Sequence, residues 1–503
     1  MRVRSSCVFL LVPVAGAVAL TACGGGGGGY SSPMMPPPPP PAMPTVSFTS
    51  PAQATSINFG RAVTLAWSST NATSCTASMS STSGGTFTGT QPTTGNSVTV
   101  VPTASGTVTY TLTCMGTGGS ASATTSTVTV LPSLLSTLSV AGITTIGSTV
   151  PTSGNGNGDN NPYGLAIAPV TSGLITKGDL IVCNFNAVSG TQGTGTTIVG
   201  LHPTAGATNY QIAQDANLTG CNALAMLPDD SISAATAATT NPNPLVTSAG
   251  VITNPFAADT FGGPWGEAYA AANGSNPAAL YVSNLDGTVD RISLNGDAQT
   301  GALTQIASGF CHSGSAGAYF APAGLTYDPS IDTLYVVDTS SYSVVAFANV
   351  SSIGAAGVLV NGQCQTSTTP PTPAPTFSGP SATSARVIAT GGMFLAPLSA
   401  ALLPNGDLLV ENADINIHSQ TPDLVFEISP VLPGGFVGQP VQLVNDGMSG
   451  ALFGIAITTD ATGNPIVYFN DDTATPNNVV MKLTTAPSGS SAPPMTPPMP
   501  PGY

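Results

Sequence analysis

Few residues of this chain have the types and spacing that catalysis needs. The sequence holds three histidines, His202, His312 and His418, and contains no HExxH, CxxCH or GxSxG motif. Cys311 and His312 are neighbours along the chain, which does not orient them as nucleophile and base, and we expect Cys311 to be oxidised. No catalytic residue is therefore predicted. The chemistry left to examine is that of carboxylates, amide oxygens and cysteines.

Glu267 is the carboxylate with the most unusual position. Four related segments of the chain have an apolar residue at the matching place: Leu165, Leu325, Ala400 and Ile455. If this position faces the centre of the fold, a lone carboxylate is unfavourable unless an ion or water meets it, so Glu267 is a candidate metal ligand. The alternative is an inserted turn that leaves Glu267 in solvent.

Two short segments carry oxygen ligands of the kind that Ca²⁺ prefers. Residues 154–161 alternate glycine with asparagine and aspartate, and residues 470–472 are Asn-Asp-Asp. Neither has the spacing or the closing glutamate of an EF-hand loop, and ordinary turn chemistry accounts for both. We predict no cofactor, and Ca²⁺ is the one ion that these residues leave open.

The N-terminal residues predict the compartment. Arg2 and Arg4 precede an apolar run over residues 8–20, which ends in Leu20, Thr21, Ala22 and Cys23. This pattern resembles the lipobox of bacterial lipoprotein signals. The resemblance implies a signal peptide over residues 1–22 and lipid on Cys23. In such lipoproteins an aspartate after the cysteine is linked to retention in the inner membrane, and Gly24 stands there instead. The resemblance therefore favours the outer membrane, with the protein either periplasmic or exposed on the surface. The alternative is an ordinary signal peptide or an uncleaved anchor, although the run is short for a membrane span.

Six further cysteines are expected to form disulfides, because their number is even and the chain is expected to be exported: Cys75, Cys114, Cys183, Cys221, Cys311 and Cys364. The sequence alone does not decide among the possible pairings. Sequential pairing is the simplest, because each bond then falls within one module or between neighbouring repeats. The absence of any CxxC makes zinc a poor alternative.

Charge excludes some partners. Without residues 1–22, five basic residues face 22 acidic ones, a net charge of −17. So few cations cannot neutralise a phosphate backbone or dock on anionic lipid by charge, so nucleic acid is not an expected partner and membrane attachment would depend on the lipid. Residues 23–44 are a Gly- and Pro-rich tether, and residues 487–503 are a Pro- and Met-rich tail expected to be disordered.

Residues 45–132 predict a small β-sandwich. Apolar and polar residues alternate over 63–67, 97–101 and 108–114, and Gly-Gly turns separate them. Residues 65–75 resemble bacterial immunoglobulin-like modules of surface lipoproteins. Trp67 precedes the first cysteine instead of following it, so the family's disulfide placement is not transferred. Trp67 and Tyr110 are expected in the core.

Residues 136–486 repeat one unit. A Pro-x-Gly turn with an apolar strand recurs at 162–166, 264–268 and 322–326, with looser copies at 397–401 and 452–456 and a degenerate one at 224–230. A second strand follows in five copies and ends in a polar residue: Asn184, Asn284, Asp338, Asn412 or Asn470. Repetition of this polar row favours a structural role in turns. Six all-β units predict a six-bladed β-propeller, and the pattern resembles propellers of the NHL type.

These observations favour a non-enzymatic binding or scaffold protein that is lipid-anchored in the cell envelope and presents its propeller to a protein or carbohydrate partner. The alternative is a propeller enzyme, either a calcium-dependent lactonase or esterase or a quinone-dependent dehydrogenase. Residues 261–265 weakly resemble the opening of gluconolactonase-like propellers, in which a glutamate before Gly-Pro binds the metal. Gly262 occupies that place here, so Glu267 would have to substitute.

Overall fold

The described part of the chain consists of β-strands with a few short 3-10 turns. The computed structural model describes residues 35–93, 96–138, 143–237, 243–296, 298–313, 320–364, 374–391, 396–412, 423–431, 434–437, 440–444, 452–472 and 478–485. The chain divides into two compact units, Met1–Ala42 and Met43–Tyr503, and every strand belongs to the second. No helix among the described residues is long and apolar enough to cross a bilayer.

Three small sheets form the sandwich. Their strand orders are β1 (Thr45–Ser50), β3 (Val63–Thr70), β6 (Asn96–Val100); β2 (Thr55–Asn58), β10 (Val128–Leu131), β7 (Gly106–Val108); and β5 (Gly89–Gln91), β4 (Ser74–Met79), β8 (Tyr110–Gly116), β9 (Gly119–Thr124). The alternation over residues 63–67 buries Val63, Leu65 and Trp67 and leaves Thr64 in solvent, as predicted.

The sandwich core is aromatic. The Trp67 ring meets Phe87 edge-on at a centroid distance of 5.8 Å, and Phe87 meets Tyr110 in the same way. Both predicted core residues are thus buried, and the Tyr110 hydroxyl donates to the Gly84 carbonyl at 2.9 Å. Cys75 and Cys114 are direct cross-strand partners on β4 and β8. The disulfide therefore lies within one sheet, whereas in antibody domains it joins two sheets.

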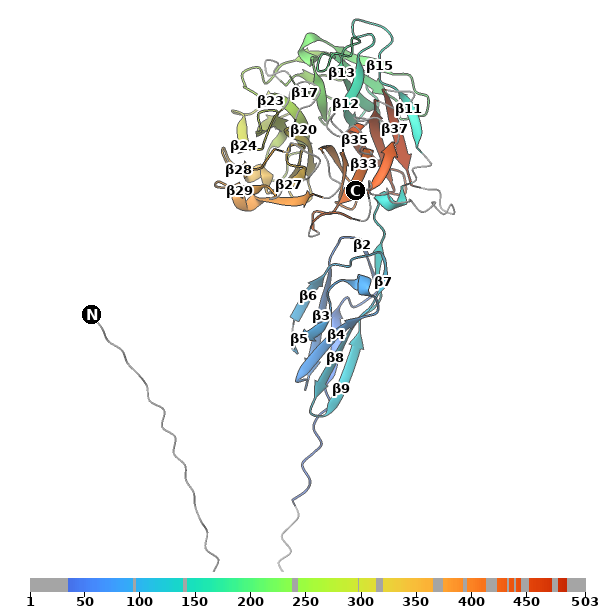
Figure 1. Ribbon diagram of the computed structural model, residues 1–503, viewed down its shortest axis with the longest axis vertical. Coiled ribbons are helices and arrows are strands. Elements are labelled where there is room, and N and C mark those ends of the chain that lie inside the picture. Colours follow the sequence, from blue (N-terminus) through green and yellow to red (C-terminus); the bar gives the residue numbers. More distant parts are fainter. Residues whose placement is uncertain are drawn as a thin grey trace, which may run out of the picture. The chain divides into compact units, whose positions relative to one another are not determined.

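Six antiparallel sheets form the blades of a closed propeller (Figure 1). From the first strand outward, blade 1 consists of β12 (Asn160–Ile167), β13 (Leu180–Asn186), β14 (Thr197–Leu201) and β15 (Tyr210–Gln214), and blade 2 of β16 (Cys221–Met226), β17 (Ile232–Thr236), β18 (Leu245–Val246) and β19 (Ile252–Thr253). Blade 3 consists of β20 (Pro264–Ala270), β21 (Ala278–Asn284), β22 (Val289–Asn295) and β24 (Thr304–Ser308), and blade 4 of β25 (Pro322–Asp328), β26 (Thr333–Asp338), β27 (Ser343–Ala348) and β30 (Ala385–Thr390). Blade 5 consists of β31 (Pro397–Leu402), β32 (Leu408–Asn412), β33 (Asp423–Ile428) and β34 (Val441–Val444), and blade 6 of β35 (Leu452–Thr459), β36 (Pro465–Asp471), β37 (Val479–Thr484) and β11 (Thr144–Ser148). The predicted all-β fold class with a propeller is confirmed, and the immunoglobulin-like character of the sandwich stays a prediction.

The ring closes at blade 6. Each first strand contacts the first strand of the next blade, and β35 contacts β12, so the six strands surround one axis. The outermost strand of blade 6 is β11, which comes from the beginning of the propeller sequence and pairs with β37 so that Ser148 lies opposite Val479. The two ends of the propeller sequence are thereby hydrogen-bonded in one sheet.

The glycine of the Pro-x-Gly repeat allows close packing of blades. A Cβ atom on Gly266 would lie 2.0 Å from the carbonyl oxygen of Ala323 in blade 4, and one on Gly454 would lie 2.3 Å from that of Tyr163 in blade 1. No side chain fits at such a distance, so the repeat requires glycine where neighbouring first strands approach.

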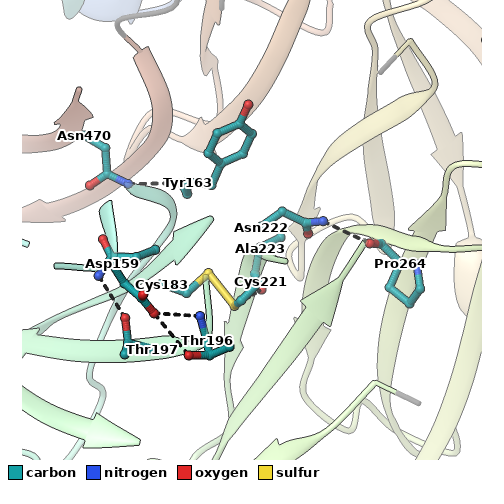
Figure 2. The surroundings of a disulfide bond; sticks show 11 residues. Asp159, Tyr163, Cys183, Thr196, Thr197, Cys221, Asn222, Ala223, Pro264 and Asn470 are labelled. Atoms are coloured by element: carbon teal, nitrogen blue, oxygen red, sulfur yellow. Dashed lines mark hydrogen bonds between the residues drawn. A yellow bond between two sulfur atoms is a disulfide. The ribbon is translucent and has the colours of Figure 1, made fainter. Parts of the chain in front are cut away.

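Side chains also link one blade to the next at this level. Asn470 of blade 6 donates to the Tyr163 carbonyl in blade 1, and Asn222 of blade 2 donates to the Pro264 carbonyl in blade 3 (Figure 2). Between these two seams, Cys183 of β13 is bonded to Cys221 of β16, so blades 1 and 2 are joined covalently. The third disulfide joins Cys311, after β24, to Cys364. It secures a hairpin of β28 (Val358–Asn361) and β29 (Thr376–Ser378) that extends the sheet of blade 3. All three bonds follow the sequential pairing.

Candidate binding site on the propeller

The start of the first strands is filled by a cluster of apolar side chains. The middle residue of the Pro-x-Gly repeat points inward in five blades, and with Phe185 these residues form one buried cluster: Tyr163, Trp265, Ala323, Leu398 and Phe453. Tyr163 and Phe453 stack with ring centroids 4.1 Å apart, and Trp265 meets Tyr163 edge-on at 5.9 Å. We name this set the axial cluster. It packs the blades together where the repeat predicted only a turn.

The end of the first strands is open. A pocket of about 550 Å³ lies between blades 4, 5 and 6, lined by residues 328–330, 402–406 and 457–459. These segments are the turns after β25 and β31 and the last residues of β35, so three consecutive blades each contribute the same part of the repeat. We name this space the turn pocket. Sequence reasoning did not predict it, because the repeat places these residues in turns without indicating how the turns pack.

The chemistry of the turn pocket suits an uncharged or basic ligand. Its lining alternates aliphatic residues, such as Leu402 and Ile457, with the hydroxyls of Thr458 and Thr459. Among the described residues of the lining, Asp328 is the one that carries a charge, and its Oδ1 already accepts bonds from the backbone and hydroxyl of Ser330. The volume falls within the range of ordinary ligand sites, roughly 300–1,000 Å³.

Glu267, the predicted candidate metal ligand, lies between two blades. Its Oε1 accepts a hydrogen bond from the Ser233 hydroxyl at 2.9 Å and another from the Asn243 side-chain amide, both from blade 2. The side chain is 6% exposed, and burial raises its pKa to about 7, opposed by the bonds from Asn243, Ser233 and the Ala225 backbone. Burial outweighs these contacts and favours a carboxylic acid that keeps its proton up to about pH 7, at a place between blades that the repeat did not indicate.

The described residues contain no group of three or more His, Cys, Asp or Glu side chains arranged to hold a metal ion. In residues 154–161, Asp159 Oδ2 accepts bonds from the backbone and hydroxyl of Thr196, so this carboxylate fastens a turn (Figure 2). Of residues 470–472, Asn470 holds the seam to blade 1. Ca²⁺ at Glu267 or in either segment stays a prediction.

Gly262, which departs from the gluconolactonase-like pattern, has no room for a side chain. A Cβ atom there would lie 2.0 Å from the carboxylate of Asp286, which accepts bonds from the backbone and hydroxyl of Thr288. A turn-capping aspartate thus occupies the space that a glutamate at 262 would need.

The strand-end polar row is used inside the fold. Asn184 donates to the Thr149 carbonyl, and Asp338 accepts bonds from Ser340 in the turn that follows β26. Asn284 donates to Thr288 in the same manner. These contacts agree with the structural role favoured from sequence.

One polar cluster was not anticipated. Asp179, which is buried, accepts a hydrogen bond from the Tyr210 hydroxyl at 2.5 Å and pairs with Nδ1 of His202 at 2.6 Å. The three residues belong to blade 1 but follow no recognised motif. Among the described contacts, the cluster joins a carboxylate and an imidazole to a tyrosine hydroxyl and not to the serine or cysteine that a catalytic triad requires.

Cys23, the predicted lipidation site, lies outside the described residues, as do the tail and most of the tether. The six other predicted cysteines are all in disulfides. Cys311 is therefore oxidised, as expected, and cannot serve with His312 as a nucleophile.

Comparison with known proteins gives distant structural similarity. No family model matches the chain, and no curated protein matches its sequence. Among solved structures, the chain is similar to the extracellular domain of a protein described as a one-component system from Bacteroides thetaiotaomicron, at 10% identity and a TM-score of 0.34 over 72% of this chain and 38% of that one. It is also similar to Sqt1 of Saccharomyces cerevisiae, at 11% identity and a TM-score of 0.35 over 88% and 98%.

A third similar structure is a quinoprotein alcohol dehydrogenase-like protein of B. thetaiotaomicron, at 8% identity and a TM-score of 0.23 over 87% and 96% of the two chains. The chain thus spans well under half of the first structure named. At these scores none of the three carries an argument about function, which depends on the site described above.

Proposed function

We propose that this chain is a lipid-anchored protein of the bacterial cell envelope that binds a protein partner through the turn pocket and catalyses no reaction. The observation that carries the proposal is the turn pocket itself, an open space between three blades of a closed frame. Turns held by a rigid scaffold are the usual place of binding in such folds.

The location rests on two features. The lipobox at residues 20–23 resembles that of exported lipoproteins, and the three disulfides suit an oxidising compartment outside the cytoplasm. The chain's own few cations favour attachment by lipid over attachment by charge.

The choice of a protein partner rests on the lining. Leu402 and Ile457, with Pro329 and Pro404, offer aliphatic surface that a peptide side chain can bury. The described part of the lining holds no aromatic ring on which a sugar could stack. Asp328 and the net negative charge favour a neutral or basic peptide over an acidic one.

Filling the pocket tests the proposal. Thr459 is exposed at its rim, and Thr459→Trp would occupy the space without disturbing buried contacts. Ala271 holds the matching place after β20, in a blade that does not line the pocket, so Ala271→Trp is the control. Peptides selected from a random phage-displayed library should bind the unchanged chain and Ala271→Trp equally, and Thr459→Trp at least about tenfold more weakly.

Two results would overturn it. Selected peptides that bind Thr459→Trp as well as the unchanged chain would place binding elsewhere. The partner would instead be a carbohydrate if glycans on an array bind the unchanged chain and Ala271→Trp but not Thr459→Trp, and no peptide shows this pattern.

A further inference from the structure

An arginine of the sandwich reaches into blade 5. Arg61 lies between β2 and β3, and its Nη2 donates to the carbonyl of Asn405 at 2.6 Å and lies 2.9 Å from Oδ1 of Asp407. The Asp407 side chain is fully buried, and 26% of the Arg61 side chain is exposed. Burial makes this ion pair far more sensitive to the loss of either charge than a surface pair would be.

A second buried carboxyl lies beside the first. Glu427 is on β33, and the side-chain amide of Asn405 donates to Asp407 Oδ2 at 2.9 Å and to Glu427 Oε1 at 3.4 Å. The other oxygen, Glu427 Oε2, accepts the backbone N–H of Leu135 at 2.8 Å. Leu135 belongs to the segment that connects the sandwich to the propeller. One carboxyl pair therefore holds both the sandwich and its connection.

The charges around this pair are few. Arg61 is the cation in direct contact with Asp407, and Tyr335 of β26 lies within electrostatic range of both. Arg386 of β30 acts on Tyr335 and donates to the Pro430 carbonyl, so among the described residues Arg61 is the direct counter-ion beside the two carboxyl groups. If Asp407 and Glu427 were both ionised, two buried negative charges would face the single positive charge of Arg61, which is unfavourable.

We propose that Asp407 and Glu427 together carry one negative charge, matched by Arg61, and that ionisation of the second carboxyl releases the connecting segment and the sandwich from blade 5. The sandwich is then more than a passive spacer. It is held against the propeller in weakly acidic solution and is free to move in alkaline solution.

The direction of the pH effect follows from the pair. Burial, together with the charge of Asp407 and against the bond from Leu135, raises the pKa of Glu427 to about 7. Burial also raises the pKa of Asp407, and Arg61 lowers it. Since a raised carboxyl pKa means that the folded state binds the proton more tightly, the contact is retained below neutral pH and lost as the pH rises through about 7.

Hydrogen exchange at the Leu135 amide tests the proposal in the full chain. Exchange is expressed as protection relative to the intrinsic rate at each pH, with the buried amide of Ile181 as an internal reference for the intact fold. Between pH 6 and 8.5 the protection of residues 134–138 should fall about tenfold or more relative to Ile181. In Glu427→Gln, which still accepts the Leu135 bond and cannot ionise, this fall should be absent.

Arg61→Gln should reduce the protection at pH 6 already. The control is Arg291→Gln, because Arg291 also donates to backbone carbonyls, those of residues 350, 351 and 353, within the propeller. It should leave residues 134–138 protected. The proposal would be overturned if residues 134–138 of the unchanged chain were equally protected at both pH values. It would also be overturned if their protection fell as much in Glu427→Gln as in the unchanged chain. If Arg61→Gln does not fold, the Glu427→Gln comparison decides alone.

Discussion

The rings of Tyr163 and Phe453 stack with their planes 11° apart, although 290 residues of sequence separate them. Tyr163 belongs to blade 1 and Phe453 to blade 6, so the stack lies on the seam where the propeller closes. Because both rings also belong to the axial cluster, they pack the first and the last blade against the same core.

Removing either ring should destabilise the propeller. Tyr163→Ala and Phe453→Ala should each lower the free energy of unfolding by about 3–5 kcal/mol, as for other buried aromatic residues. The double variant should lose about 0.5–1.5 kcal/mol less than the sum, which is the coupling of stacked rings. Urea unfolding followed by tryptophan fluorescence measures all three. Tyr163→Phe keeps the ring and should stay within about 1 kcal/mol of the unchanged chain; additive losses in the double variant would contradict the stack.

Glu267→Gln should change how stability depends on pH. Because burial raises the pKa of Glu267 from 4.5 to about 7, the folded chain keeps this proton when the unfolded chain has lost it. The unchanged chain should therefore lose about 3 kcal/mol through this residue as the pH rises from about 4.5 to about 7. The variant should match it at pH 4.5 and exceed it at pH 8.

Thermal or urea unfolding of both chains across this pH range gives the difference in their free energies of unfolding. The contributions of other buried carboxyls, such as Asp290 and Glu427, are the same in both chains and cancel in this difference. Parallel pH profiles would show that Glu267 does not titrate as described. A metal ion that is retained by the unchanged chain and lost from Glu267→Gln would confirm the metal-ligand prediction.

The disulfide between blades 1 and 2 should contribute strongly to stability. Replacing Cys183 and Cys221 with alanine opens a loop of 38 residues, and the free energy of unfolding should fall by about 3–4 kcal/mol. The matched control replaces Cys75 and Cys114, which close a loop of 39 residues in the sandwich. Calorimetry should assign the first loss to the propeller and the second to the sandwich. If both variants instead lower the temperature of one and the same unfolding transition, the sandwich and the propeller unfold together.

Lipidation can be tested at one residue. Cys23→Ser should move the protein from the detergent phase to the aqueous phase in detergent phase partitioning, because the acyl chains provide the attachment. Cys7, which lies within the predicted signal peptide, provides the control, and Cys7→Ser should remain in the detergent phase. A Cys23→Ser chain that still enters the detergent phase would favour an uncleaved anchor.

The repeat predicted the propeller well because a blade is a local pattern. The six copies coincide with β12, β16, β20, β25, β31 and β35, and even the degenerate copy near residue 224 is a first strand. The sequential disulfides follow for the same reason, since neighbouring repeats become neighbouring blades. The strand β11 was included in the propeller region but not recognised as part of blade 6, because its partner β37 lies at the other end of the sequence.

The sites were less predictable because they depend on side-chain direction. Glu267 differs from the apolar residues at the matching place of other repeats, but its partners Ser233 and Asn243 come from the preceding blade, which the repeat does not specify. The turn pocket and the Asp179 cluster are assembled from residues that share no motif. Arg61 was visible as an isolated cation, but nothing in the sequence connects it to a carboxyl more than 300 positions later.

The pairing of β11 with β37 sets the order of events when this protein is made. Blade 6 cannot be completed until residue 484 has been synthesised, so β11 must wait, with an open edge, until the whole propeller sequence is available. During that interval the unfinished ring is exposed to aggregation and proteolysis. A truncation that removes only β37 would thus leave β11, from the beginning of the propeller sequence, without its partner in the sheet.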